Sequence, residues 1–276
     1  MIDSSDDRQL LALAKRATSL ASELIRSRAP HVVTSKGDRD LTSDVDTAVE
    51  QLLRDFLRHH TPNLGFLGEE GGADPVDGSR WILDPIDGTI NFLHGLPLCA
   101  VSLSLMCNGA TLVGVIDMPF LGVQYYALSG HGSYANDQRL RVSTTQTLNA
   151  ALVSVDQYTF GVGTDYANSA RRQLIEHLAP RAQRVRMLGA SAIDLAWTAQ
   201  GRLDACIIVG NKLWDTSAGV LIAREAGARI LDLHGANHTA DSSATIAVGP
   251  SLEQELMAAI RAAFANTAPA NGLDHT

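Results

Sequence analysis

The spacing of apolar residues near the start of the chain predicts two amphipathic helices. Across residues 5–27, apolar side chains recur at intervals of three and four, the repeat of a helix with one buried face. The Ala29-Pro30 pair ends this segment. A second segment with the same repeat places its buried face between residues 48 and 57, and Thr42 or Ser43 can cap its start.

After this point the pattern changes to short apolar runs, which predict strands. These runs are residues 64–67, 81–83, 99–106, 111–116, 123–128 and 133–135. The dipeptide Asn108-Gly109 separates two of them, and it favours the tight turn of a β-hairpin. We therefore expect the first half of the chain, residues 1–148, to consist of two helices covering an antiparallel sheet.

The second half, residues 149–265, is predicted to alternate strands and helices. The expected strands are residues 151–155, 184–188, 203–209, 229–233 and 245–248. The expected helices are residues 166–178, 191–199, 216–226 and 252–265. Such alternation is typical of an α/β layer structure. Residues 266–276 are small, polar and rich in turn formers, which predicts a frayed tail.

Composition narrows the classes of protein that these elements suit. The chain has 276 residues, of which 45% are hydrophobic and 19% charged, as is ordinary for a globular protein. Its formal net charge of −8 argues against binding to nucleic acid. No apolar run is long enough to span a membrane, and the start of the chain is acidic where a signal peptide is basic. We therefore expect a cytoplasmic protein with no membrane contact.

The cysteines offer no disulfide or zinc chemistry. Cys99, Cys107 and Cys206 lie within apolar runs, are odd in number and show no CxxC spacing. We expect buried, reduced thiols.

Acidic residues gather where predicted strands end. Glu69 and Glu70 follow one apolar run, Asp84 and Asp87 follow another, and Asp215 follows a third. Carboxylates that converge on one crevice repel each other unless cations neutralise them. Mg²⁺ prefers oxygen ligands, and these clusters contain no His or Cys. The pattern therefore predicts a magnesium site.

The segment DPIDGT, residues 84–89, has a spacing suited to this chemistry. We expect Asp84 to end a strand, and the turn that follows to direct the Asp87 carboxylate and the Ile86 carbonyl toward one point. Gly88 would let the backbone approach a phosphate closely. A helix beginning at Thr89 would present free N–H groups to that anion.

A near copy of this segment, DPVDGS at residues 74–79, tests the interpretation. It follows Gly71-Gly72-Ala73, with no apolar strand to direct its acids. We therefore interpret the copy as a surface turn.

Three motifs together resemble the inositol monophosphatase family. They are DPIDGT with Asn91-Phe92, the run Gly68-Glu69-Glu70, and Trp214-Asp215 before a small-residue helix. The similarity extends over nearly the whole chain. It implies a layered α-β-α-β-α fold of the α+β or α/β class, with two sheets and the metal site at their junction. It also implies Mg²⁺-dependent hydrolysis of a phosphate monoester, inhibition by Li⁺, and a homodimer.

The resemblance also implies how the metal is held. Glu69, Asp84 and the Ile86 carbonyl would hold a first Mg²⁺ ion. Asp84, Asp87 and Asp215 would hold a second, with Asp84 shared between them. Such ions, two or three in number, would clamp the attacking and leaving oxygens of an in-line displacement.

The remaining roles implied by the resemblance concern water and substrate. Asp46 would orient Thr89, and Thr89 with Glu69 would position and deprotonate the attacking, metal-activated water. The residues implied to contact substrate are Asp87, Gly88, Thr89, Arg186 and Asp215. For Arg186, a solvent-exposed position at a strand end is an equal alternative.

The substrate is where this chain departs from the family. Seven residues before Asp215, inositol-specific members carry a glutamate that hydrogen-bonds substrate hydroxyls, and this chain has Ile208. Asn211 and Lys212 offer other polar contacts, and Lys36 lies one residue nearer to Asp40 than in animal members. We expect a small phosphorylated polyol or sugar resembling inositol 1-phosphate. A nucleotide monophosphate, 3′-phosphoadenosine 5′-phosphate and histidinol phosphate are alternatives.

Other classes of protein fit less well. The segment Asp44-Val45-Asp46-Thr47 resembles the start of haloacid-dehalogenase phosphatases, but Ala48 follows it and the preceding residues are too polar for a buried strand. The sequence has no Gly-x-Ser-x-Gly elbow and no phosphate-binding Gly-x-x-x-x-Gly-Lys loop. A regulatory, partner-binding protein on a phosphatase fold is the non-enzyme alternative. The complete set of acids and Thr89 favours the enzyme.

Overall fold

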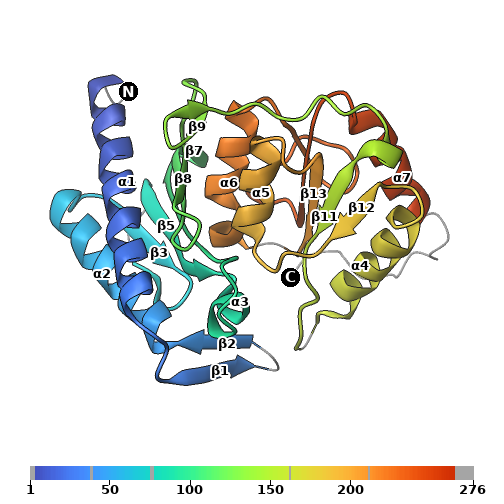
Figure 1. Ribbon diagram of the computed structural model, residues 1–276. Coiled ribbons are helices and arrows are strands. Elements are labelled where there is room, and N and C mark those ends of the chain that lie inside the picture. The colour runs from blue at the N-terminus through green and yellow to red at the C-terminus, as the bar shows by residue number, and fades with distance from the viewer. Residues whose placement is uncertain (1–3, 38–39, 75–77, 162, 211, 265–276) are drawn as a thin grey trace.

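The structure, a computed structural model, describes residues 4–37, 40–74, 78–161, 163–210 and 212–264. Two sheets and three layers of helices alternate as α-β-α-β-α (Figure 1). The layered fold implied by the resemblance is therefore confirmed. The predicted tail and the proline-containing part of the 74–79 segment lie outside the described residues.

The first layer consists of the two predicted helices, α1 (Ser4–Ser27) and α2 (Asp44–His60). Ala14, Ala17 and Ala21 of α1 are fully buried, and their small side chains let the helix lie close to the sheet. Ser43 caps α2, as one of the two predicted caps, and forms a capping box with Asp46.

The large sheet has eight strands in the order β10-β9-β8-β7-β6-β5-β3-β4. Their bounds are β3 (Gly65–Gly68), β4 (Gly72–Ala73), β5 (Arg80–Asp87), β6 (Ala100–Cys107), β7 (Ala110–Met118), β8 (Val123–Leu128), β9 (Ser133–Ala135) and β10 (Gln138–Arg139). Asn108 and Gly109 both have positive φ and join β6 to β7, as predicted.

One strand pair of this sheet differs from the prediction. The expected sheet is wholly antiparallel, but β3 and β5 are parallel. The chain reverses through the edge strand β4 and then returns beside β3. Parallel neighbours bring their carboxyl ends together, so the acids that follow β3 lie next to those at the end of β5.

The middle layer contains α3 (Thr89–Leu93), α5 (Ser191–Ala199) and α6 (Leu213–Glu225). Helix α6 is apolar on most sides because it lies between the two sheets. A Cβ on Gly114 of β7 would lie 2.8 Å from the Ala218 carbonyl oxygen, so this glycine permits the close approach of α6. The helix begins three residues earlier than predicted, which places Asp215 in its first turn.

The small sheet has the order β12-β11-β13-β15-β14 and mixes parallel and antiparallel pairs. Its strands are β11 (Leu152–Val155), β12 (Arg184–Arg186), β13 (Ala205–Val209), β14 (Arg229–Leu231) and β15 (Ala244–Val248). Helices α4 (Asp165–Leu178) and α7 (Glu253–Phe264) cover its outer face (Figure 1). Each element predicted for this half is present, α5 with the predicted bounds and the others with one or both ends shifted by one to three residues.

Five short elements were not predicted: β4, β10, β1 (Val33–Gly37), β2 (Asp40–Ser43) and the 3₁₀ turn η1 (Leu148–Ala150). The hairpin of β1 and β2 is polar and its first strand is fully exposed, so no alternation of apolar residues marks it. The three cysteines are free, with Cys99 and Cys206 buried. Among the described residues, no helix combines the length and apolarity that crossing a membrane requires.

Candidate active site

The acids predicted to converge do line one cavity. Glu69, Asp84, Asp87 and Asp215 all border a cavity of about 560 Å³. They come from the ends of β3 and β5 and from the first turn of α6. The cavity therefore lies where the large sheet meets the helix layer that separates the two sheets.

The geometry at the end of β5 corrects the prediction that Asp84 ends the strand. The strand continues to Asp87 and contains a β-bulge, because Asp84 pairs with Ser102 and Asp87 with Ala100. A bulge rotates the strand locally and redirects its side chains. Asp84 Oδ1 accepts a hydrogen bond of 3.1 Å from the Ile86 N–H within it. Both acids thereby reach the same cavity.

At the next position, residue 88, the backbone conformation and the neighbouring atoms require a glycine. Its φ is +86°, and a Cβ there would lie 2.7 Å from the Leu98 carbonyl oxygen. Helix α3 begins directly after it at Thr89, as predicted. Gly88 and Thr89 both line the cavity.

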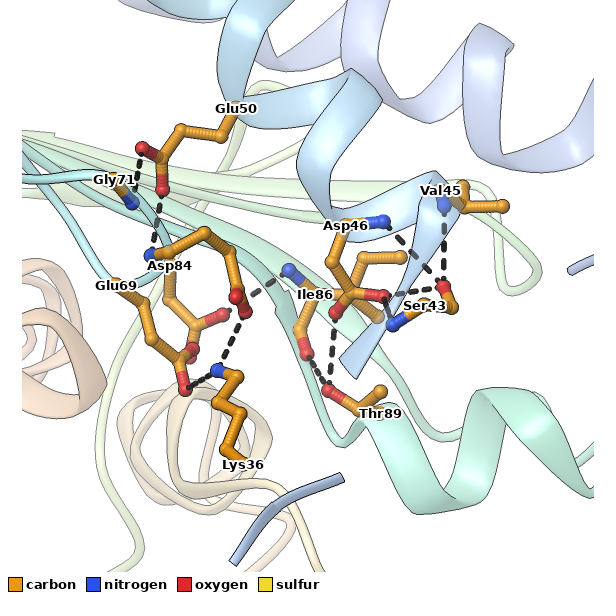
Figure 2. A network of polar contacts seen from close by, with 11 residues as sticks. Lys36, Ser43, Val45, Asp46, Glu50, Glu69, Gly71, Asp84, Ile86 and Thr89 are labelled. Atoms are coloured by element: carbon orange, nitrogen blue, oxygen red, sulfur yellow. Dashed lines mark hydrogen bonds and ion pairs between the residues drawn. The ribbon is translucent and has the colours of Figure 1, made fainter. Parts of the chain in front are cut away.

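Thr89 and Asp46 form the pair implied by the resemblance. Thr89 Oγ1 lies 3.2 Å from Asp46 Oδ1 and 3.0 Å from the Ile86 carbonyl oxygen (Figure 2). The other oxygen of Asp46 accepts bonds from the Ser43 N–H at 3.0 Å and the Ser43 hydroxyl at 2.5 Å. The Asp46 carboxylate is therefore held by the start of its own helix while it faces Thr89.

Burial and mutual repulsion make these acids reluctant to ionise. Burial raises the pKa of Asp84 well above its ordinary value, and the charges of Glu69, Asp87 and Asp215 raise it further. The pKa of Asp87 is also well raised, by burial and then by Asp215. Burial raises the pKa of Asp215 to about 6. A cation in the cavity would relieve this cost.

Lys36, on β1, brings a positive charge to the same acids. Its Nζ lies 2.9 Å from Glu69 Oε1 and 2.6 Å from Glu70 Oε1 (Figure 2). Burial alone would lower the pKa of the Lys36 ammonium, but its bonds to Glu70 and Glu69 outweigh that effect and raise it. Lys36 therefore contacts the carboxylates in this structure.

The donor set suits a hard cation such as Mg²⁺, since it consists of carboxylates and one carbonyl, all oxygen. Several of these oxygens are engaged by main-chain N–H groups. Asp87 accepts from Ala192 at 2.6 Å, and Asp215 accepts from Lys212 at 3.1 Å. No three His, Cys, Asp or Glu groups within the described part of the chain already form a cage for an ion. In the described part of the chain, the four acids border the cavity without being gathered around one point.

The predicted substrate residues are placed unequally. Ile208 is 2% exposed at the end of β13 and lines the cavity, as does Lys212. Arg186 is exposed at the end of β12, donates to the Val185 carbonyl oxygen, and is not among the described residues that line the cavity. Asn211 lies outside the described residues.

Sequence analysis missed a buried ion pair in the cavity wall. Arg171 is 1% exposed on α4, and its Nε and Nη2 donate to the two carboxylate oxygens of Asp156 at 3.0 and 2.5 Å. Asp156 also accepts from the Val209 N–H at 3.1 Å. The pair ties α4 to the ends of β11 and β13. The sequence signal that could have revealed this pair is the position of Arg171 among the apolar residues on the buried face of the predicted helix 166–178.

Comparison with known proteins gives a consistent result. The sequence model described as the inositol monophosphatase family matches residues 6–265. Inositol monophosphatase 1 of Solanum lycopersicum is 33% identical over 262 residues, which cover 92% of this chain and 95% of that protein. The Thermotoga maritima protein named fructose-1,6-bisphosphatase/inositol-1-monophosphatase is 34% identical over 208 residues, covering 75% and 77%.

A solved structure agrees with these sequence matches. The extragenic suppressor protein suhB from Bartonella henselae superimposes with a TM-score of 0.86 at 29% sequence identity. The match covers 92% of this chain and 98% of that one.

Proposed function

The chain belongs to the inositol monophosphatase family and is a phosphoric monoester hydrolase, and we propose that it hydrolyses a small phosphorylated polyol or sugar with Mg²⁺ as cofactor. The observation that carries this proposal is the convergence of Glu69, Asp84, Asp87 and Asp215 on one cavity. Such a set of buried acids is costly to keep without a cation, so it points to a site for metal rather than to a structural role.

We propose that these four acids, together with the Ile86 carbonyl, are the metal ligands. Glu69, Asp84 and the Ile86 carbonyl would hold one Mg²⁺, and Asp84, Asp87 and Asp215 a second. When bound, Mg²⁺ supplies positive charge that stabilises the phosphoryl group as it is transferred.

Thr89 and Glu69 act on the attacking water. The Thr89 hydroxyl donates its hydrogen to Asp46 at 3.2 Å, which leaves its lone pairs free to accept a hydrogen bond from water in the cavity. Glu69, on the adjacent wall, accepts the proton that the water loses as its oxygen bonds to phosphorus. The bond from phosphorus to the alcohol oxygen breaks on the opposite side, and that oxygen leaves with the bonding electron pair and takes a proton from solvent water, so the reaction is a direct displacement.

The phosphoryl group would lie against the main chain at Gly88 and Thr89, both of which line the cavity. The alcohol would extend toward Ile208, Lys212 and the segment 156–160, which form the far wall. The printed names of two relatives, an inositol monophosphatase and a fructose-1,6-bisphosphatase/inositol-1-monophosphatase, favour a polyol or sugar.

The test is a comparison of kcat/KM over a panel of phosphomonoesters with Mg²⁺ and with a chelator. The panel contains inositol 1-phosphate, a sugar phosphate, a nucleotide monophosphate, 3′-phosphoadenosine 5′-phosphate and histidinol phosphate. We expect chelation, Asp87→Asn and Asp215→Asn each to abolish phosphate release. Activity that survives both substitutions would refute the metal site. A nucleotide or histidinol phosphate as the best substrate would refute the polyol assignment alone.

A further inference from the structure

Glu50 lies beneath the turn that carries Glu69 and is not among the residues assigned above. It belongs to α2 and is 4% exposed. Its Oε2 accepts a hydrogen bond of 2.8 Å from the Glu70 N–H, and its Oε1 accepts one of 2.8 Å from the Gly71 N–H (Figure 2). One carboxylate thus holds two consecutive amides of the turn after β3.

The turn is shaped to receive this carboxylate. A Cβ on Gly68 would clash with the Glu50 carboxylate, and a Cβ on Gly71 would lie 2.6 Å from Glu50 Oε1. Neither glycine has a positive φ, so the close approach of Glu50, and not the backbone conformation, excludes a side chain at these positions. The two glycines that flank Glu69 and Glu70 therefore make room for Glu50.

Glu50 is neutralised on its other side. Arg54, one turn further along α2, donates to Glu50 Oε1 at 3.0 Å and to Asp74 Oδ1 at 2.7 Å. Both oxygens of Glu50 are thus engaged by donors of the protein. This arrangement suits a carboxylate that supports a turn and not one that holds a metal ion.

Asp46 and Glu50 lie one helical turn apart on α2, so both face the ends of β3 and β5. Asp46 contacts Thr89, while Glu50 holds the turn that bears Glu69. We propose that Glu50 is a positioning residue, which fixes Glu69 relative to Thr89 so that one helix aligns both groups that act on water. This inference rests on the proposed function, because it assumes the roles given there to Glu69 and Thr89.

The test compares Glu50→Gln with Asp55→Asn. The first substitution keeps the size of the side chain but leaves one acceptor for two N–H groups. The second makes the same chemical change on an exposed part of α2, where Asp55 accepts a hydrogen bond of 2.9 Å from the Gln51 side chain. Four quantities are measured: kcat, KM, the Mg²⁺ concentration for half-maximal activity, and the rise in Tm that Mg²⁺ produces.

We expect Glu50→Gln to lower kcat by about 10- to 100-fold, as loss of a group supporting a metal ligand does. KM should change little, more Mg²⁺ should be needed, and the rise in Tm on adding Mg²⁺ should shrink. Asp55→Asn should leave all of these values near those of the unsubstituted protein. If Glu50→Gln does not fold, Gly71→Ala serves instead, since it displaces the Glu50 carboxylate without removing its charge.

The outcomes separate this inference from the function on which it rests. If Glu50→Gln loses thermal stability but keeps kcat and the full Mg²⁺-induced rise in Tm, the positioning role of Glu50 is overturned. If the unsubstituted protein hydrolyses no phosphomonoester, the proposed function fails. A smaller Mg²⁺-induced rise in Tm in Glu50→Gln would then still support the hold of Glu50 on the turn.

Discussion

At one end of the cavity, Glu69, Thr89 and its partner Asp46 are held by contacts within the first half of the chain, whereas the far wall is built from the second half, much of it from loops. The Glu69 N–H donates to the Leu83 carbonyl oxygen at 3.2 Å, and Ser43 holds Asp46. The far wall includes segment 156–160 and Lys212, much of it exposed. The acids and Thr89 thus lie at strand ends and helix starts, while loops, which are free to vary, supply much of the wall toward which we propose that the alcohol extends.

The largest expected effect on kcat within this comparison comes from substituting Thr89 or Asp46, at the end of the cavity that the first half of the chain holds. Thr89→Val and Asp46→Asn should each lower kcat by about 10²- to 10⁴-fold, because each removes part of the group that orients water. The double variant should be little worse than either single one, since the two residues act as a unit. Thr47→Val, on the exposed face of α2, is the control. Additive losses in the double variant would show that Thr89 and Asp46 act separately.

Removing the ion pair between Arg171 and Asp156 in the far wall should mainly lower the stability of the protein and weaken substrate binding. Arg171→Met leaves the Asp156 carboxylate buried without its partner, which should lower the free energy of unfolding by roughly 3–5 kcal/mol. Urea unfolding measures this loss, and Arg172→Met on the exposed side of α4 is the control. KM should rise more than kcat falls. A fall in kcat at unchanged KM would mean that the wall also serves the chemical step.

The raised pKa values of the acids predict how stability depends on pH without metal. The pKa of Asp84, Asp87 and Asp215 is higher in the folded protein than in the unfolded chain, so the folded state binds more protons. Their contribution to stability is complete below about pH 4 and is lost as pH rises through the value of about 6 for Asp215.

Urea unfolding in chelator at pH 5 and 7.5 checks this dependence. The loss between the two values should be smaller in Asp215→Asn, which no longer titrates there. Mg²⁺ binds the ionised acids of the folded state, so the stability it adds should be greater at pH 7.5. A pH dependence identical in Asp215→Asn and the unsubstituted protein would contradict the assignment.

The smallest effect is expected at Arg186. The resemblance implies a substrate contact, but the side chain is exposed and lies outside the cavity wall in the described residues. Arg186→Gln should therefore change kcat/KM by no more than about twofold, the range of ordinary surface substitutions. A tenfold rise in KM would show that the far wall includes β12.

Much of the fold follows from short-range pattern. The repeat of apolar residues predicted α1 and α2, and Asn108-Gly109 predicted the hairpin of β6 and β7. These features depend on residues close in sequence, whose spacing decides which side chains share a face. The polar hairpin of β1 and β2 has no such pattern and was missed.

The sequence by itself also predicted which acids and which glycine line one cavity, because strand ends and the DPIDGT spacing are local features. Only the tertiary structure decided the parallel pairing of β3 with β5, the bulge between Asp84 and Asp87, and the hold of Glu50 on a turn twenty residues away. It also decided that Arg171 lines the wall while Arg186 does not. Such contacts join segments far apart in the chain, and they exist only once the packing of whole layers has fixed where each segment lies.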